Sequence, residues 1–168
     1  IYGTQWQQIP HTSNSLVADM SSDIFSRELD FNAFDLIYAG AQKNMGPAGV
    51  NLIVVNRNIL GKIKRPIPTI MDYRNHIREG SMLNTPNTFG WYLAGLTFKW
   101  LAREGGLAEM ERRNDAKAKR LYDYIDASGF YNNPIDVAAR SRMNLPFRLA
   151  DEKLDDAFLK ESEAAGLM

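Results

Sequence analysis

Cysteine is absent from the sequence, and histidine occurs only twice. Without cysteine, these residues offer no disulfide, no thiolate zinc site and no cysteine nucleophile, which fits a reducing compartment such as the cytoplasm. His11 and His76 are far apart in the sequence and have no neighbouring ligand pattern, so we expect no metal site. The sequence therefore predicts neither thiol nor metal chemistry.

An excess of charge of one sign and long apolar runs are also missing. The 20 basic and 20 acidic side chains cancel, so no global field favours nucleic acid, an anionic membrane or an acidic partner. No apolar run approaches the roughly 20 residues of a membrane span, and no signal peptide is visible. With 45% hydrophobic and 24% charged residues, the composition is that of an ordinary soluble chain.

The length and the two ends of the chain bear on its domain organisation. Its 168 residues suffice for one hydrophobic core, or for one domain and part of another. The sequence begins without methionine and stops just past an apparent helix end, so we expect a fragment. The glycine pair Gly105–Gly106 separates two long helical patterns. We expect a domain boundary there, between residues 1–105 and 106–168.

Lys43 follows a short apolar run. Leu36–Ala39 has the pattern of a buried strand, and the small segment Gly40–Gln42 leads from it to Lys43. A lysine at the end of a core strand can lose part of its hydration, which favours the neutral amine that attacks carbonyl groups. This is the profile of a Schiff-base lysine. The alternative is a surface lysine whose ammonium extends to water.

Asp19 has the same position after another predicted strand, Leu16–Ala18. Taken alone, an aspartate there is more often a turn or helix-cap residue. In open α/β sheets, however, ligands bind beyond the carboxyl ends of the strands, so Asp19 and Lys43 are candidates to meet at one ligand. Pyridoxal phosphate needs such a pair, because its carbonyl binds a lysine and its ring nitrogen must be kept protonated by a carboxylate. The pattern alone also permits other uses.

The remaining elements are predicted from periodicity, capping signals and proline positions. The segment Ile67–Ser81 has no clean period, so we expect a loop. A helix over Phe89–Arg103 is expected to be largely buried and to begin at Thr85 with Pro86, or at Thr88. The other expected elements are strands over Gly49–Val55 and Arg142–Leu149 and helices over Leu107–Ala127 and Asp151–Gly166.

Several stretches of the sequence match the motifs of one family, in order along the chain. They are Val17–Ser22, Tyr38–Asn44, Gly46–Gly49, Met82–Phe89, Phe98–Leu101 and Arg140–Phe147. These stretches closely resemble the phosphoserine aminotransferases, which are class-V pyridoxal-phosphate-dependent aminotransferases. The likeness covers essentially the whole chain.

The resemblance implies an α/β fold of the aspartate-aminotransferase type (fold type I) with pyridoxal 5′-phosphate as cofactor. Residues 1–105 would be the end of the large cofactor-binding domain with the interdomain helix, and residues 106–168 most of the small α+β domain. The enzyme would move an amino group between glutamate and 3-phosphohydroxypyruvate, giving O-phospho-L-serine and 2-oxoglutarate in serine biosynthesis. A related substrate, 4-phosphohydroxy-L-threonine, would link it to pyridoxine biosynthesis. It would be a cytoplasmic homodimer with shared active sites, without nucleic-acid or membrane partners.

The resemblance also implies roles for five residues. Lys43 would bind the cofactor and then move the proton between the substrate's α-carbon and the cofactor. Asp19 would pair with the ring nitrogen, and Gln42 would lie near the ring hydroxyl. Asn84 and Thr85 would reach across a dimer interface to the cofactor phosphate of the other subunit, in keeping with the affinity of helix N-termini for anions.

The family's chains are about twice as long as this one, as two-domain enzymes of this kind are. We therefore expect residues 1–168 alone to be inactive. One alternative is another class-V enzyme, such as an alanine–glyoxylate aminotransferase or a cysteine desulfurase, although the latter needs a cysteine that this segment lacks. The other alternative is a non-catalytic structural fragment.

Overall fold

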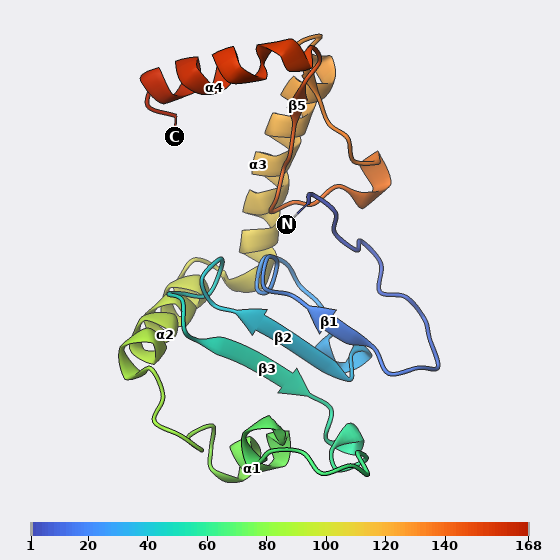
Figure 1. Ribbon diagram of the computed structural model, residues 1–168, viewed down its shortest axis with the longest axis vertical. Helices are drawn as coiled ribbons and strands as arrows, with labels where there is room; N and C mark the ends of the chain where they lie inside the picture. The colour runs from blue at the N-terminus through green and yellow to red at the C-terminus, as the bar shows by residue number, and fades with distance from the viewer. Residues whose placement is uncertain (1, 168) are drawn as a thin grey trace. The chain divides into compact units, whose positions relative to one another are not determined.

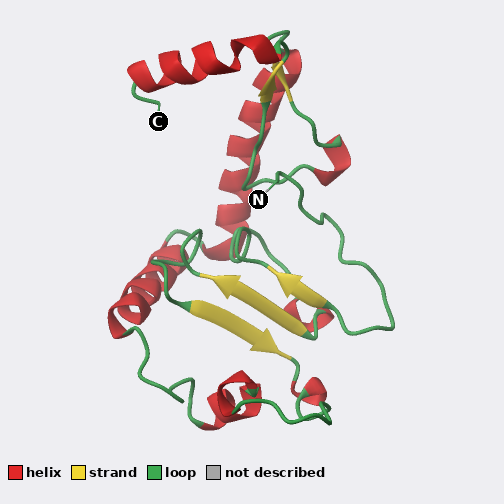
Figure 2. Ribbon diagram, in the orientation of Figure 1, coloured by secondary structure: helices red, strands yellow, loops and turns green. Residues whose placement is uncertain are grey.

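The computed structural model describes residues 2–167, which form two compact units (Figures 1 and 2). One unit contains Ile9–Glu111, and the other joins the residues up to Gln8 with those from Arg112 onward. Helix α3 (Gly106–Ala127) contributes residues to both units, and the expected domain boundary after residue 105 stays a prediction. The assignment of these units to the large and small domains of the family stays a prediction.

A three-stranded sheet forms the centre of the first unit. Its order is β1 (Val17–Asp19), β2 (Leu36–Gly40) and β3 (Asn51–Val55), as Figure 1 shows. Strand β1 is parallel to β2, whereas β3 is antiparallel to it. The register pairs Asp19 with Tyr38. Because β1 and β2 are parallel, their carboxyl ends meet at the same edge of the sheet.

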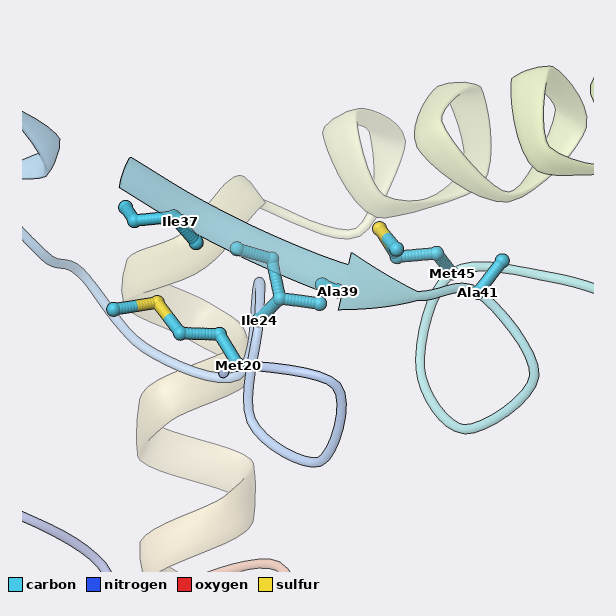
Figure 3. Packing of buried hydrophobic residues seen from close by; sticks show 6 residues of the cluster. All are labelled: Met20, Ile24, Ile37, Ala39, Ala41 and Met45. Carbon is cyan, nitrogen blue, oxygen red and sulfur yellow. The ribbon is translucent and has the colours of Figure 1, made fainter. Parts of the chain in front are cut away.

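The hydrophobic core of this unit lies against one face of β2. Successive side chains of a strand point to opposite faces, so Ile37 and Ala39 are buried while Tyr38 between them is 41% exposed. The chain that follows β1 brings Ile24 under the sheet, where it is completely buried. Figure 3 shows the cluster, which consists of Met20, Ile24, Ile37, Ala39, Ala41 and Met45.

Truncating Ile24 is expected to destabilise this unit strongly. Ile24→Ala removes buried apolar side-chain atoms and leaves a cavity in the core. We therefore expect the free energy of unfolding to fall by about 2–5 kcal/mol. Ile53→Ala is the matched control, because Ile53 lies on β3 with 37% of its surface exposed and should lose less. Urea denaturation followed by circular dichroism measures both. Equal losses would contradict the placement of Ile24 in the core.

Helix α1 (Tyr73–Arg78) lies within the segment that the sequence predicts to be a loop. That prediction is wrong for these residues because Asp72 caps the helix: its carboxylate accepts a hydrogen bond from the backbone N–H of Arg74 at 3.0 Å. The same carboxylate pairs with the Arg74 guanidinium. A short 3₁₀ turn, Thr69–Met71, precedes the helix. The capping hydrogen bond therefore stabilises a helix that the spacing of apolar residues does not predict.

Helix α2 spans Thr88–Arg103 and follows a loop. The predicted start at Thr85 is wrong, and Thr88 is the first helical residue, because the N-cap is Asn87, whose side-chain oxygen accepts a hydrogen bond from Gly90 N–H at 3.0 Å. The predicted burial of the helix is also wrong. Of its residues, all described, just Gly90 and Ala94 are buried, and the exposed large side chains are Phe89, Trp91, Tyr92, Leu96, Phe98 and Trp100.

Close packing explains which part of α2 is covered. A Cβ placed on Gly46 would lie 3.2 Å from the Ala94 backbone, and one on Gly90 would lie 2.8 Å from a methyl group of Val50. Gly46 also has a φ of 152°, which favours glycine. The helix therefore touches the sheet and its loops at its small residues, while the aromatic ones stay outside this contact.

The second unit contains the rest of α3, a two-stranded antiparallel sheet of β4 (Tyr131–Asn132) and β5 (Arg148–Leu149), and helix α4 (Asp155–Ala164). The N-terminal residues join it through hydrogen bonds from Gln5 N–H to Ala139 O at 2.9 Å and from Ser141 N–H to Gly3 O at 2.8 Å. Its aromatic rings meet in edge-to-face and tilted contacts among Phe130, Tyr131, Phe147 and Phe158.

The strand predicted over Arg142–Leu149 forms only at its last two residues. The Ser141 hydroxyl oxygen accepts the N–H groups of Met143 and Asn144 at 3.1 and 3.0 Å, which turns the chain. Pro146 has no N–H to give to a ladder. These two features override the alternation of polar and apolar residues.

Among the described residues, none of the helices has both the length and the apolar character needed to cross a membrane.

Candidate active site

The carboxyl ends of β1 and β2 carry the two residues that the sequence singled out. Asp19 is the last residue of β1, and Lys43 lies in the tight turn that directly follows β2. In that turn the N–H of Met45 donates to Ala41 O at 2.9 Å, so the chain bends back as soon as β2 ends. The charge of Lys43 acts on the Asp19 carboxylate, so the two groups share one electrostatic environment.

The Asp19 side chain is held as a carboxylate. Its Oδ1 accepts a hydrogen bond from the backbone N–H of Ser21 at 2.9 Å. Partial burial raises the pKa of Asp19, but hydrogen bonds from Ser21 and Tyr38 and the positive charge of Lys43 outweigh it, so the pKa lies below its ordinary value. Asp19 is therefore charged throughout the physiological range.

Tyr38 is a member of the site that sequence reasoning missed. It is the β2 partner of Asp19 in the sheet register, and its hydroxyl helps to lower the pKa of the Asp19 carboxyl. The negative charge of Asp19 raises the pKa of Tyr38, so the phenol keeps its proton. A signal was available, because Tyr38 lies between two buried residues of a strand and so must point to the opposite face. The register with β1 could not be read from the sequence.

Lys43 is exposed, so the predicted loss of hydration is wrong for this chain. Lys43 lies in the turn after β2, and the described residues do not bury its side chain. The Nζ atom instead donates a hydrogen bond to the Ser22 hydroxyl oxygen at 2.8 Å. The amine is thus directed to the loop that follows β1.

Gln42 folds back over the end of β2. A Cβ added to Gly40 would lie 2.5 Å from the Gln42 side-chain oxygen, so the glycine makes room for this side chain. The Gly40 N–H donates to the Ser21 hydroxyl oxygen at 3.0 Å. Gln42 therefore lies at the same sheet edge as Lys43, whose neighbour it is in the sequence. Its predicted contact with a ring hydroxyl stays a prediction.

Asn84 and Thr85 lie at a different place. Both are exposed and line a groove of about 650 Å³ bounded by β3, α1 and the first turns of α2. Ala41 and Met45 also line this groove, but the described lining residues include neither Asp19 nor Lys43. The structure therefore joins Asp19, Gln42 and Lys43 at one edge and leaves Asn84 and Thr85 apart from them.

The chemistry of this edge fits pyridoxal phosphate. A carboxylate that stays ionised can keep a ring nitrogen protonated, and a primary amine on the neighbouring strand end can bind a carbonyl. The Asp19 carboxylate and the Lys43 amine are of these two kinds. For a metal ion the case is different: within residues 2–167, no group of three or more histidine or acidic side chains is arranged to hold one.

Comparisons with known proteins agree with this geometry. Residues 4–166 match the family described as aminotransferase class-V. The chain is 54% identical, over its whole length, to the curated phosphoserine aminotransferases of Pseudomonas putida and Azotobacter vinelandii. It covers 47% of each, so it spans about half the length of the curated relatives it matches.

Solved structures show the same fold. The phosphoserine aminotransferase of Bacillus circulans subsp. alkalophilus superimposes with a TM-score of 0.92 at 43% identity, over 99% of this chain and 46% of that one. A PLP-bound phosphoserine aminotransferase of Trichomonas vaginalis gives a TM-score of 0.91 at 36% identity, over 99% of this chain and 48% of that one. The predicted aminotransferase fold is confirmed. The chain belongs to the class-V aminotransferase family.

Proposed function

We propose that the intact polypeptide carrying this sequence is a phosphoserine transaminase that uses pyridoxal phosphate. It would convert glutamate and 3-phosphohydroxypyruvate into 2-oxoglutarate and O-phospho-L-serine, in the cytoplasm. The observation that carries the proposal is the meeting of Asp19 and Lys43 at one sheet edge, in a chain 54% identical over its length to enzymes of that name. Residues 1–168 by themselves, about half of such an enzyme, are not expected to turn over glutamate.

The proposed division of labour follows from the charges and partners of the two residues. When bound, pyridoxal phosphate supplies the electron sink that makes the substrate's α-proton removable. Asp19 would hold the protonated ring nitrogen, and it stays ionised because the Ser21 N–H donates to it and its pKa is lowered. Lys43 Nζ would supply the amine that binds the cofactor's carbonyl and, once the substrate's amino group has displaced it, would serve as the base that moves the α-proton.

The remaining predicted site residues serve the ring hydroxyl, in the case of Gln42, and the phosphate of the partner subunit's cofactor in this proposal. Gln42 binds near the cofactor from its place beside Gly40. Asn84 and Thr85, on the loop before α2, reach the cofactor phosphate of a second subunit in a homodimer. The exposed aromatic residues of α2, among them Phe89 and Tyr92, support an interface on this side because such side chains are seldom left in water.

A substrate comparison tests the proposal. The intact polypeptide with pyridoxal phosphate and 2-oxoglutarate is given O-phospho-L-serine or L-alanine, and glutamate formation is followed with glutamate dehydrogenase. We expect kcat/KM for phosphoserine to exceed that for alanine by at least about 100-fold, because a site built for the phosphate leaves its polar groups unpaired with alanine. A kcat/KM for alanine above that for phosphoserine would favour the other class-V aminotransferases. Absence of transamination with every pair would favour a non-catalytic role.

A further inference from the structure

The loop after β1 is fastened to the turn that carries Lys43. Besides the hydrogen bond from Lys43 Nζ to Ser22 Oγ, the Asn44 side-chain amide donates to Ile24 O at 2.5 Å. On the other side of the loop, the Ser21 hydroxyl accepts the N–H of Gly40. Contacts therefore join the loop to both the end of β2 and the turn beyond it.

Ser22 has a fixed position in this loop. The N–H of Met20 donates to Tyr38 O at 2.9 Å, and the N–H of Ile24 donates to Met20 O at 2.8 Å. These bonds close a tight turn around Ser22. The turn is anchored from below because Met20 and Ile24 belong to the buried core (Figure 3). The Ser22 hydroxyl is thus presented to Lys43 by a rigid piece of chain, while the lysine side chain is long and otherwise free to rotate.

The choice of partner by Lys43 is informative. Asp19 lies at the same edge, and its carboxylate is a stronger acceptor for an ammonium than a neutral hydroxyl is. Nevertheless, among residues 2–167, no ion pair within 4 Å joins Lys43 to Asp19, and the amine is bonded to Ser22. An ion pair between the two would occupy the carboxylate and the amine at once, and both are needed for other partners in the proposed function.

We propose that Ser22 is a positioning residue that holds the amine of Lys43 away from the carboxylate of Asp19. The inference rests on the proposed function, because that function gives the two charges separate tasks. Tyr38 and Lys43 are the titratable groups that face Asp19 from β2 and from the turn after it. The pKa of Tyr38 is raised, so its phenol stays neutral and Lys43 is the cation that could neutralise the carboxylate.

The test uses the intact polypeptide freed of cofactor. Lysines are acylated at neutral pH with an N-hydroxysuccinimide ester, and the rate at Lys43 is measured by peptide mass mapping relative to Lys62. In Ser22→Ala the amine should pair with Asp19, which lowers the fraction of reactive neutral amine. We expect the relative rate to fall about two- to fivefold, the range of an exposed ion pair. Ser22→Thr keeps the hydroxyl and should stay within about 1.5-fold of the wild type.

A second variant keeps the test valid if Ser22→Ala does not fold. Ser22→Cys has nearly the same shape but a weak acceptor, so its relative rate should also fall. A rate that is unchanged or raised in the folded alanine or cysteine variant would overturn the inference, since the amine would then not move onto Asp19. The assay needs no turnover. Loss of the substrate preference described above would therefore count against the proposed function alone.

Discussion

Replacing Lys43 with alanine is expected to abolish amino transfer by the intact polypeptide. The substitution removes the amine that binds the cofactor's carbonyl and, with it, the base that moves the α-proton. Positioned acid–base catalysis alone contributes up to about 10⁴-fold, so we expect kcat to fall by about that factor or more. Single-turnover conversion of O-phospho-L-serine measures the effect. Intact mass after borohydride reduction shows in parallel whether cofactor remains attached to the protein.

Two control substitutions separate chemistry from folding in this experiment. Lys43→Arg keeps the positive charge but offers no amine that can bind a carbonyl, so its activity should be as low as that of Lys43→Ala. Lys62→Ala removes a lysine of the exposed segment after β3 and should leave kcat within about twofold. Retention of cofactor mass by Lys43→Ala, or activity in Lys43→Arg near the wild-type value, would contradict the role given to Lys43.

The strand ends were the part of the site that the sequence could predict. Two short apolar runs, each followed by one chemically useful side chain, define Asp19 and Lys43 through local pattern alone. A rule about parallel sheets then brings them to the same edge. Nothing in that reasoning depends on how the strands are paired residue by residue. A single sequence therefore suffices to predict that the two side chains share one sheet edge, as they do in the structure, while their roles stay predictions.

The partners of those residues depend on register and loop geometry, which the sequence does not encode locally. Tyr38 meets Asp19 because the two are paired across β1 and β2. Ser22 meets Lys43 because a turn anchored by Ile24 folds back under the sheet. The hydration of Lys43 was mispredicted for the same reason, since burial depends on what covers a strand end. A local sequence pattern identifies the side chain but not the residues that bury it.

The same distinction explains the errors in the helices. The apolar face of α2 is real, but periodicity shows only which side of a helix is apolar, and the described residues cover just its small residues near Gly46 and Val50. Helix α1 has too little apolar period to be seen, and it forms because Asp72 caps it. Capping hydrogen bonds, and the residues that bury a helix face, are individual contacts. The periodicity of apolar residues therefore cannot predict them.

Asp19→Asn is expected to lower kcat by about 10²–10³-fold while leaving the fold intact. The amide has nearly the same shape as the carboxylate but no negative charge, so it cannot keep a ring nitrogen protonated. Asp35→Asn is the matched control. Asp35 lies at the opposite end of the same two strands, where its carboxylate accepts the Leu16 N–H at 3.1 Å, and its replacement should change kcat by less than about threefold.

The pH dependence sharpens the test of Asp19. Its pKa is lowered in the folded protein, so the carboxylate contributes to stability above its ordinary pKa of 3.8, and this contribution is lost only as the pH falls through the lower, folded value. Between pH 5 and 9, Asp19 therefore does not titrate. Asp19→Asn should depress kcat by the same factor across that range, without moving the inflections of the profile. A variant that keeps the wild-type kcat between pH 7 and 9, where solvent offers few protons, would show that the ring nitrogen stays protonated without Asp19, and Asp19 would then have no part in holding it.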